Sequence, residues 1–128
     1  MTLDSSALIA ILFAEPGHLD LVDRILGADH TRIAAPTLVE ASLVFAGRRR
    51  TPDVRMLEAL ADELGITTVP LAQREWRAAV DAFLRYGRGR HKAGLNFGDC
   101  LAYAAAVTAN DSLLFVGDDF ALTDVTPA

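Results

Sequence analysis

Hydrophobic residues along the chain alternate between short continuous runs and longer stretches with helical spacing. The short runs are typical of buried strands, and we expect strands at Met1–Leu3, Arg32–Ala35, Ile66–Val69 and Leu113–Val116. Between these runs, apolar residues recur three and four positions apart, the spacing that places side chains on one face of a helix. The expected helices cover residues 7–14, 18–28, 36–47, 52–64, 72–86 and 97–109.

This alternation predicts an α/β domain with a largely parallel sheet covered on both faces. The 128 residues suit a single domain over 1–128. No apolar stretch approaches the ~20 residues of a membrane-spanning helix, and the N-terminal run lacks the basic start of a secretory signal, so we expect an intracellular protein. Pro52 is expected in the first turn of the fourth helix. One apolar stripe of the fifth helix is expected to face inward: Trp76, Ala79, Val80 and Phe83. Of these, Trp76 and Phe83 are interpreted as core or dimer-contact residues rather than platforms for stacking bases.

Charge is unevenly distributed along the chain. Acidic residues outnumber lysine and arginine 17 to 12, a net charge of −5, which argues against binding nucleic acid through bulk charge. Several cations nevertheless lie in the loop that leads into Asp99, where phosphate contact is favoured: Arg85, Arg88, Arg90 and Lys92. A second tract, Arg48–Arg50, is typical of a solvated helix end. Cys100 is the only cysteine, so the chain forms no internal disulfide.

Four acidic positions fall where strands end or helices begin. Asp4 ends the first strand, Asp118 with its neighbour Asp119 follows the last, and Glu40 and Asp99 lie early in helices that start on the same side. Ligands of parallel sheets gather beyond the carboxyl ends of the strands. Carboxylates buried there repel one another unless a cation joins them, and Mg²⁺ or Mn²⁺ prefers oxygen ligands. The pattern predicts metal-dependent phosphodiester hydrolysis.

Each acid also has a purely structural interpretation. Asp4 is placed to cap the first helix, and Asp99 lies three residues after Asn96 in the first turn of another. The stretch Thr37–Glu40 fits a capping box, and the acid pair after the last strand is common in turns. The convergence of all four positions on one edge favours a site over four separate local roles.

Four segments form an ordered set: LDSSAL at residues 3–8, Glu40, NFGDCLAYA at 96–104 and LFVGDDF at 114–120. Together they resemble a PIN-domain ribonuclease, and more narrowly the VapC toxins of bacterial VapBC toxin–antitoxin systems. The likeness spans essentially the whole chain. It implies a PIN-like three-layer α/β/α sandwich with four or five largely parallel strands, and an endoribonuclease that uses Mg²⁺ or Mn²⁺.

The resemblance also assigns roles to residues. Asp4 and Asp99 would be the principal metal ligands, Glu40 and Asp118 would complete the catalytic set, and Asp119 could share or replace the role of Asp118. Ser6 matches a hydroxyl residue that often stands beside the first acid. The implied partners are RNA, commonly transfer RNA, a second copy of the chain, and a cognate VapB antitoxin in a larger heteromeric complex. DNA would be contacted only through the antitoxin, in the bacterial cytoplasm and away from the membrane.

Two other function classes compete with this interpretation. A catalytically inactive PIN-like module would bind RNA or protein without cutting, which the intact set of acids disfavours. Receiver domains and haloacid-dehalogenase-type phosphatases also place acids at strand ends. Here Asp4-Ser5-Ser6 lacks the second acid of such phosphatases, and the only lysine is Lys92, which is not placed as a receiver requires.

Overall fold

Four parallel strands form the central sheet of the computed structural model, which describes all 128 residues. The strands are β1 (Thr2–Leu3), β2 (Thr31–Ala34), β3 (Ile66–Val69) and β4 (Leu113–Leu114), in the order β3-β2-β1-β4. Leu3 pairs with both Ile33 and Leu114. The carboxyl ends of β1, β2 and β4 therefore lie side by side at one edge of the sheet.

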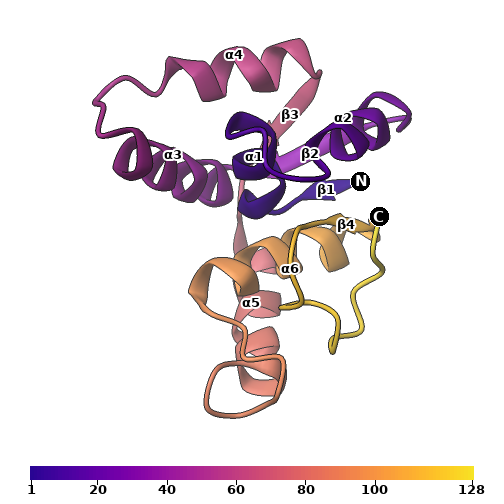
Figure 1. The fold of residues 1–128 in the computed structure, drawn as a ribbon. Coiled ribbons are helices and arrows are strands. Elements are labelled where there is room, and N and C mark those ends of the chain that lie inside the picture. The colour runs from indigo at the N-terminus through magenta and orange to yellow at the C-terminus, as the bar shows by residue number, and fades with distance from the viewer.

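Helices cover both faces of the sheet (Figure 1). One layer contains α1 (Ser5–Leu12), α2 (His18–Leu26), α3 (Ala35–Arg49) and α4 (Arg55–Glu63), and the other contains α5 (Gln73–Tyr86) and α6 (Phe97–Ala109). Separate hydrophobic clusters fill the two sides, one around Leu3, Leu8 and Ile33 and one around Leu95 and Leu113. The predicted α/β/α sandwich with a four-stranded parallel sheet is confirmed.

The alanine-rich helix α6 packs tightly against the sheet and α5. Ala102, Ala104 and Ala106 are completely buried, as small side chains allow when a helix backbone approaches its neighbours closely. This explains why the run after Asp99 is apolar on nearly every side. The same packing fixes the position of the helix's first turn, where Asp99 lies.

Two predicted details of the helices are wrong. Helix α4 begins at Arg55 rather than at Pro52, because Thr51 Oγ1 accepts from Asp53 N–H and Asp53 Oδ1 accepts from Arg55 N–H, local bonds that compete with a helical turn. On α5, Trp76, Val80 and Phe83 are 50%, 48% and 40% exposed. The helix instead buries Ala79, Ala82 and Tyr86, and most of its other large apolar side chains line the surface.

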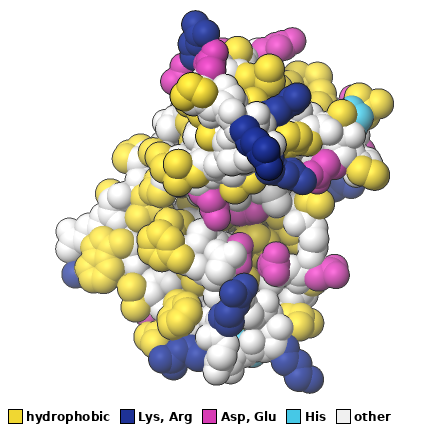
Figure 2. Space-filling model, turned by 60° about the vertical axis from the view of Figure 1, so that its left-hand side comes forward, with side chains coloured by type: hydrophobic (Ala, Val, Ile, Leu, Met, Phe, Trp, Pro, Cys, Tyr) yellow, Lys and Arg dark blue, Asp and Glu magenta, His cyan; other side chains and the backbone are white.

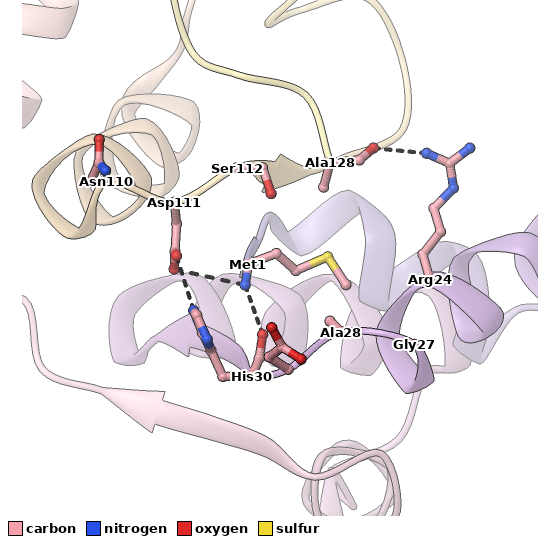
Figure 3. Close-up of a pocket in the computed structure, with 10 residues that line it drawn as sticks. Met1, Arg24, Gly27, Ala28, His30, Asn110, Asp111, Ser112 and Ala128 are labelled. Atoms are coloured by element: carbon pink, nitrogen blue, oxygen red, sulfur yellow. Dashed lines mark hydrogen bonds and ion pairs between the residues drawn. The ribbon is translucent and has the colours of Figure 1, made fainter.

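The amino ends of the strands are joined by an ionic network around Asp111. Its carboxylate contacts Arg32 Nε at 2.7 Å and His30 Nε2 at 3.0 Å, and accepts a 3.0 Å hydrogen bond from Thr2 Oγ1. The amino group of Met1 donates to the His30 carbonyl at 2.7 Å, beside a polar pocket of about 430 Å³ (Figure 3). This edge lies opposite the acids predicted to form a site. No helix is long and apolar enough to cross a membrane.

Candidate active site

Asp4 stands between β1 and α1 and divides its two oxygens between two roles. As the N-cap of α1, its Oδ2 accepts from Ser6 N–H at 2.9 Å and from Ser6 Oγ at 2.6 Å. The residue is only 4% exposed, yet Oδ1 has no hydrogen-bond partner. The capping interpretation is therefore correct, but it accounts for one oxygen only.

Ser6 also connects Asp4 to the other end of the chain. Its Oγ accepts a 3.0 Å hydrogen bond from the backbone N–H of Val116, just beyond β4. A single hydroxyl thus fixes the carboxylate of Asp4 and the segment that leads to Asp118 and Asp119. This contact spans 110 residues of sequence.

Asp99 is held at the start of α6 by a reciprocal pair of bonds with Asn96. Asp99 Oδ2 accepts from Asn96 N–H at 2.7 Å, and Asn96 Oδ1 accepts from Asp99 N–H at 3.0 Å. This capping box leaves Asp99 9% exposed and restricts its rotamer. Like Asp4, Asp99 uses one oxygen to begin a helix.

Glu40 reaches from α3 to the first turn of α6. A Cβ built on Gly98 would overlap both carboxylate oxygens of Glu40, which places that carboxylate directly against the backbone beside Asp99. The capping box expected over Thr37–Glu40 does not form, because α3 already begins at Ala35 with Pro36 in its first turn. The capping interpretation of Glu40 is wrong.

Only three buried side-chain polar atoms in the structure lack a hydrogen-bond partner: Asp4 Oδ1, Thr37 Oγ1 and Glu40 Oε2. Such atoms are rare in folded proteins because leaving one unsatisfied costs free energy. Asp4 and Glu40 come from different elements, and their charges interact. The two orphaned carboxylate oxygens are free to accept an external donor or to bind a cation.

Burial and mutual repulsion raise the pKa values of these acids. Burial raises the pKa of Asp4, and the Ser6 hydrogen bonds only partly oppose that rise. The pKa of Glu40 is raised by burial and then by the charge of Asp4, and that of Asp99 by burial and by the charges of Asp4 and Asp119. A cation bound at this position would favour the charged form of all three acids.

The donor set fits a hard divalent cation. All the available ligands are carboxylate oxygens, as Mg²⁺ and Mn²⁺ prefer, and no histidine takes part. No three acidic, histidine or cysteine side chains converge closely enough to hold an ion as they lie. Like charges that repel one another are expected to stay apart until a cation draws them together.

The last two acids differ in their effect on the others. Asp118 and Asp119 are both exposed, but only Asp119 has a charge that raises the pKa values of Asp4 and Asp99. Asp119 is thus the member of the pair that acts on the cluster. Figure 2 shows acidic side chains gathered across the middle of one face, with basic side chains above and below them.

The basic loop brings one charge to the acids. Arg88 lowers the pKa of Asp99, opposing the effect of burial. Arg85 is instead paired with Asp124 at 2.9 Å and donates to Tyr86 Oη at 2.7 Å. Arg90 lies 5.5 Å from the centre of the Phe83 ring. Lys92 is exposed.

Sequence reasoning missed Gly98 and Thr37. Thr37 was considered only as a cap, and its hydroxyl is buried without a partner. Gly98 carried a usable signal, since glycine is unfavourable inside a helix and here stands in the first turn of an otherwise alanine-rich one.

Comparison with known proteins places the chain in a family. A family model for the PIN domain matches residues 1–125. Ribonuclease VapC36 of Mycobacterium tuberculosis is 39% identical over 126 residues, covering 98% of this chain and 91% of the relative. Ribonuclease VapC of Mycolicibacterium smegmatis is 38% identical over 126 residues, covering 98% and 97%.

Two solved structures share the fold at low identity. VapC20 of Mycobacterium tuberculosis, a toxin that cleaves the sarcin–ricin loop, aligns with a TM-score of 0.75 and 11% identity over 99% of this chain and 97% of its own. A toxin–antitoxin complex from Klebsiella pneumoniae aligns with a TM-score of 0.72 and 18% identity over the same shares. With a family model that matches nearly its whole length and relatives 39% identical to it, the chain belongs to the PIN-domain family, in the branch of the VapC ribonucleases.

Proposed function

We propose that the protein is the endoribonuclease toxin of a bacterial toxin–antitoxin module, a hydrolase that cleaves RNA with Mg²⁺ or Mn²⁺ in the cytoplasm. The observation that carries this proposal is the pair of buried carboxylate oxygens without partners, Asp4 Oδ1 and Glu40 Oε2, at the edge where Asp99 lies. Relatives 39% identical to this chain over nearly its whole length are named ribonucleases. The site and the family point to the same chemistry.

In this proposal Asp4 and Asp99 are the principal metal ligands. When bound, the ion makes a water molecule more acidic and offsets the charge that develops on the phosphodiester. Glu40 and an acid after β4 complete the catalytic set by orienting the attacking water. For that last role we favour Asp119 over Asp118, because the charge of Asp119 acts on both principal acids. Ser6 keeps Asp4 in place.

The substrate would be held by its phosphates. Arg88 is the best-placed cation, since its charge acts on Asp99. Arg90 and Lys92 extend the same loop and would contact phosphates farther from the cut. Arg85 contributes less because Asp124 already pairs with it. Transfer RNA is our first candidate substrate, on the family resemblance alone.

An antitoxin would block the site by placing a positively charged side chain where the metal ion binds. An arginine inserted among the carboxylates would pair with Asp4, Glu40 and Asp99, because guanidinium binds carboxylates through two parallel hydrogen bonds. A solved structure with this fold is a toxin–antitoxin complex, which supports a protein partner of this kind. The antitoxin would supply any DNA binding of the larger complex.

An apolar groove beside the site is proposed as the contact between two copies of the chain. Two adjoining pockets of about 750 and 650 Å³ share Pro36, Leu71, Phe97 and Leu101. Phe97 is 79% exposed, and Figure 2 shows hydrophobic side chains concentrated on one side of this face. Burying such a surface against an identical one would remove its apolar area from water.

The test incubates the purified protein with total RNA and Mg²⁺ or Mn²⁺. Asp99→Asn is the control variant, because asparagine retains an oxygen that can accept from the Asn96 N–H while losing the charge. We expect discrete cleavage that chelator and Asp99→Asn both abolish. RNA binding without cleavage at any metal concentration would instead favour the inactive binding module.

A further inference from the structure

Gly98 occupies a helical position at which glycine has no conformational advantage. It lies in the first turn of α6, is buried, and is not among the glycines with positive φ. Alanine is the better helix former of the two residues. Something other than backbone geometry must therefore make glycine suitable.

The space that a side chain at position 98 would take is filled by the carboxylate of Glu40. A Cβ on Gly98 would meet Oε1, Oε2 and Cδ of Glu40 at distances that real contacts do not reach. Gly47, the other glycine within a long helix that has no positive φ, meets nothing within 4 Å. Close approach of a charged side chain is thus specific to Gly98.

This approach places Glu40 at the positive end of α6 and one residue from Asp99. A helix N-terminus stabilises a nearby negative charge, which offsets part of the cost of burying Glu40. The carboxylate nevertheless keeps Oε2 without a partner. The carboxylate therefore lies in space that the α6 backbone leaves open at Gly98, and its Oε2 is buried there without a partner.

We propose that Gly98 is a positioning residue of the site, whose missing side chain lets the Glu40 carboxylate stand against α6 beside Asp99. The inference rests on the proposed function for its catalytic meaning, because Glu40 is a member of the proposed acidic set. The contact itself is independent of that function. Any side chain at position 98 displaces Glu40 from its place.

The test compares Gly98→Ala with the matched control Gly47→Ala. Calorimetric titration with Mn²⁺, RNA cleavage and thermal unfolding are measured for each. Gly98→Ala is expected to stay folded but to bind Mn²⁺ about tenfold more weakly and to cleave with a lower kcat, the size of effect seen when support around metal ligands is lost. Gly47→Ala is expected to match the wild type in both activities. Unchanged Mn²⁺ affinity and kcat in Gly98→Ala would overturn the proposal.

A shorter acid provides the rescue. In the Gly98→Ala chain, Glu40→Asp removes one methylene and gives the new Cβ room, so Mn²⁺ affinity should recover relative to Gly98→Ala alone. In the wild-type chain the same Glu40→Asp change should weaken binding. Absence of any rescue would show that position 98 acts through the fold rather than through Glu40. Should Gly98→Ala be unstable, Glu40→Ala in the same chain must restore the melting temperature, and failure to do so overturns the contact.

Crystal structures of the metal-free wild type and Gly98→Ala separate this inference from the proposed function. A displaced Glu40 carboxylate in Gly98→Ala supports the inference even if the wild type binds no metal and cleaves no RNA, a result that would overturn the proposed function alone. An unmoved carboxylate overturns the inference whatever the activity.

Discussion

Ser6 donates its hydroxyl to Oδ2 of Asp4 at 2.6 Å, while the other oxygen of that carboxylate, Oδ1, has no hydrogen-bond partner. The same hydroxyl accepts from Val116 N–H at 3.0 Å. One small side chain therefore sets the rotamer of the first acid and ties it to the segment after β4.

Replacing Ser6 by alanine should affect stability and activity together. We expect Ser6→Ala to lower the free energy of unfolding by about 1–2 kcal/mol, because Val116 N–H loses its acceptor, and to reduce RNA cleavage about tenfold as Asp4 gains rotamer freedom. Ser6→Thr keeps the hydroxyl and is the control. Chemical unfolding and cleavage assays measure the two effects; full activity in Ser6→Ala would contradict this role.

Neutralising Asp4 should stabilise the metal-free protein. Because burial raises the pKa of Asp4 in the folded state, the favourable contribution of the protonated acid is present below the ordinary pKa of aspartate and is lost as pH rises through the raised value. Asp4→Asn keeps a capping oxygen without the charge, so we expect a gain of about 1 kcal/mol at neutral pH. The gain should vanish in acid.

Thermal unfolding from acid to neutral pH, with and without Mg²⁺, measures this effect. Mg²⁺ should raise the melting temperature of the wild type and leave that of Asp4→Asn nearly unchanged. A wild type whose stability rises steadily with pH in chelator would contradict the burial argument.

The two acids after β4 should differ in importance. The charge of Asp119 is among the causes that raise the pKa values of Asp4 and Asp99. We therefore expect Asp119→Asn to lower kcat about tenfold or more and Asp118→Asn to change it little. Cleavage kinetics under saturating Mn²⁺ compare the two variants. The opposite order would assign the fourth acid to Asp118.

Two arginines of the basic loop should also differ in how much they contribute to RNA binding. Arg88→Gln should weaken RNA binding roughly tenfold, the value of a charge-assisted contact, and reduce the salt dependence of binding by about 0.7 in logarithmic slope. Arg85→Gln should alter binding much less because Arg85 already pairs with Asp124. Binding is measured in the Asp99→Asn chain to prevent cleavage. Equal losses of RNA affinity in both variants would show that Arg88 contributes no more than Arg85.

A charge placed in the apolar groove should separate two copies of the chain. Trp76 lines the groove, and Trp76→Glu is expected to shift the protein from a dimer to its 13.7 kDa monomer in light scattering. Leu26→Glu is the control, because Leu26 is similarly exposed on α2, outside the groove. A monomeric wild type would contradict the proposed contact.

The layout of the fold could be predicted because strands and helices leave distinct hydrophobic periods, and the parallel topology then brings Asp4 and Asp99 to one edge. Periodicity shows which side chains share a face but not what that face meets. The apolar stripe of α5 that includes Trp76 was therefore expected inside, although the helix buries Ala79, Ala82 and Tyr86 instead. The start of α4 was misplaced because side-chain bonds at Thr51 and Asp53 outweigh the preference of Pro52 for a first turn.

The roles of single atoms in the site could not be predicted from the sequence. The spacing of residues suggested that Glu40 closes a capping box. Its carboxylate instead lies against Gly98, because α3 and α6 pack together in the folded chain. The difference between Asp118 and Asp119 likewise depends on how the chain turns after β4. These properties arise from tertiary packing between distant segments.

Asp4 and Asp99 each commit one carboxylate oxygen to starting a helix. A spontaneous mutation to alanine at either position would therefore fray α1 or α6 in addition to removing a ligand. Such alanine variants would be more prone to proteolysis, because frayed helix ends expose their backbone. Selection for a stable fold alone would therefore disfavour alanine at these two positions but would tolerate asparagine, which keeps the capping oxygen.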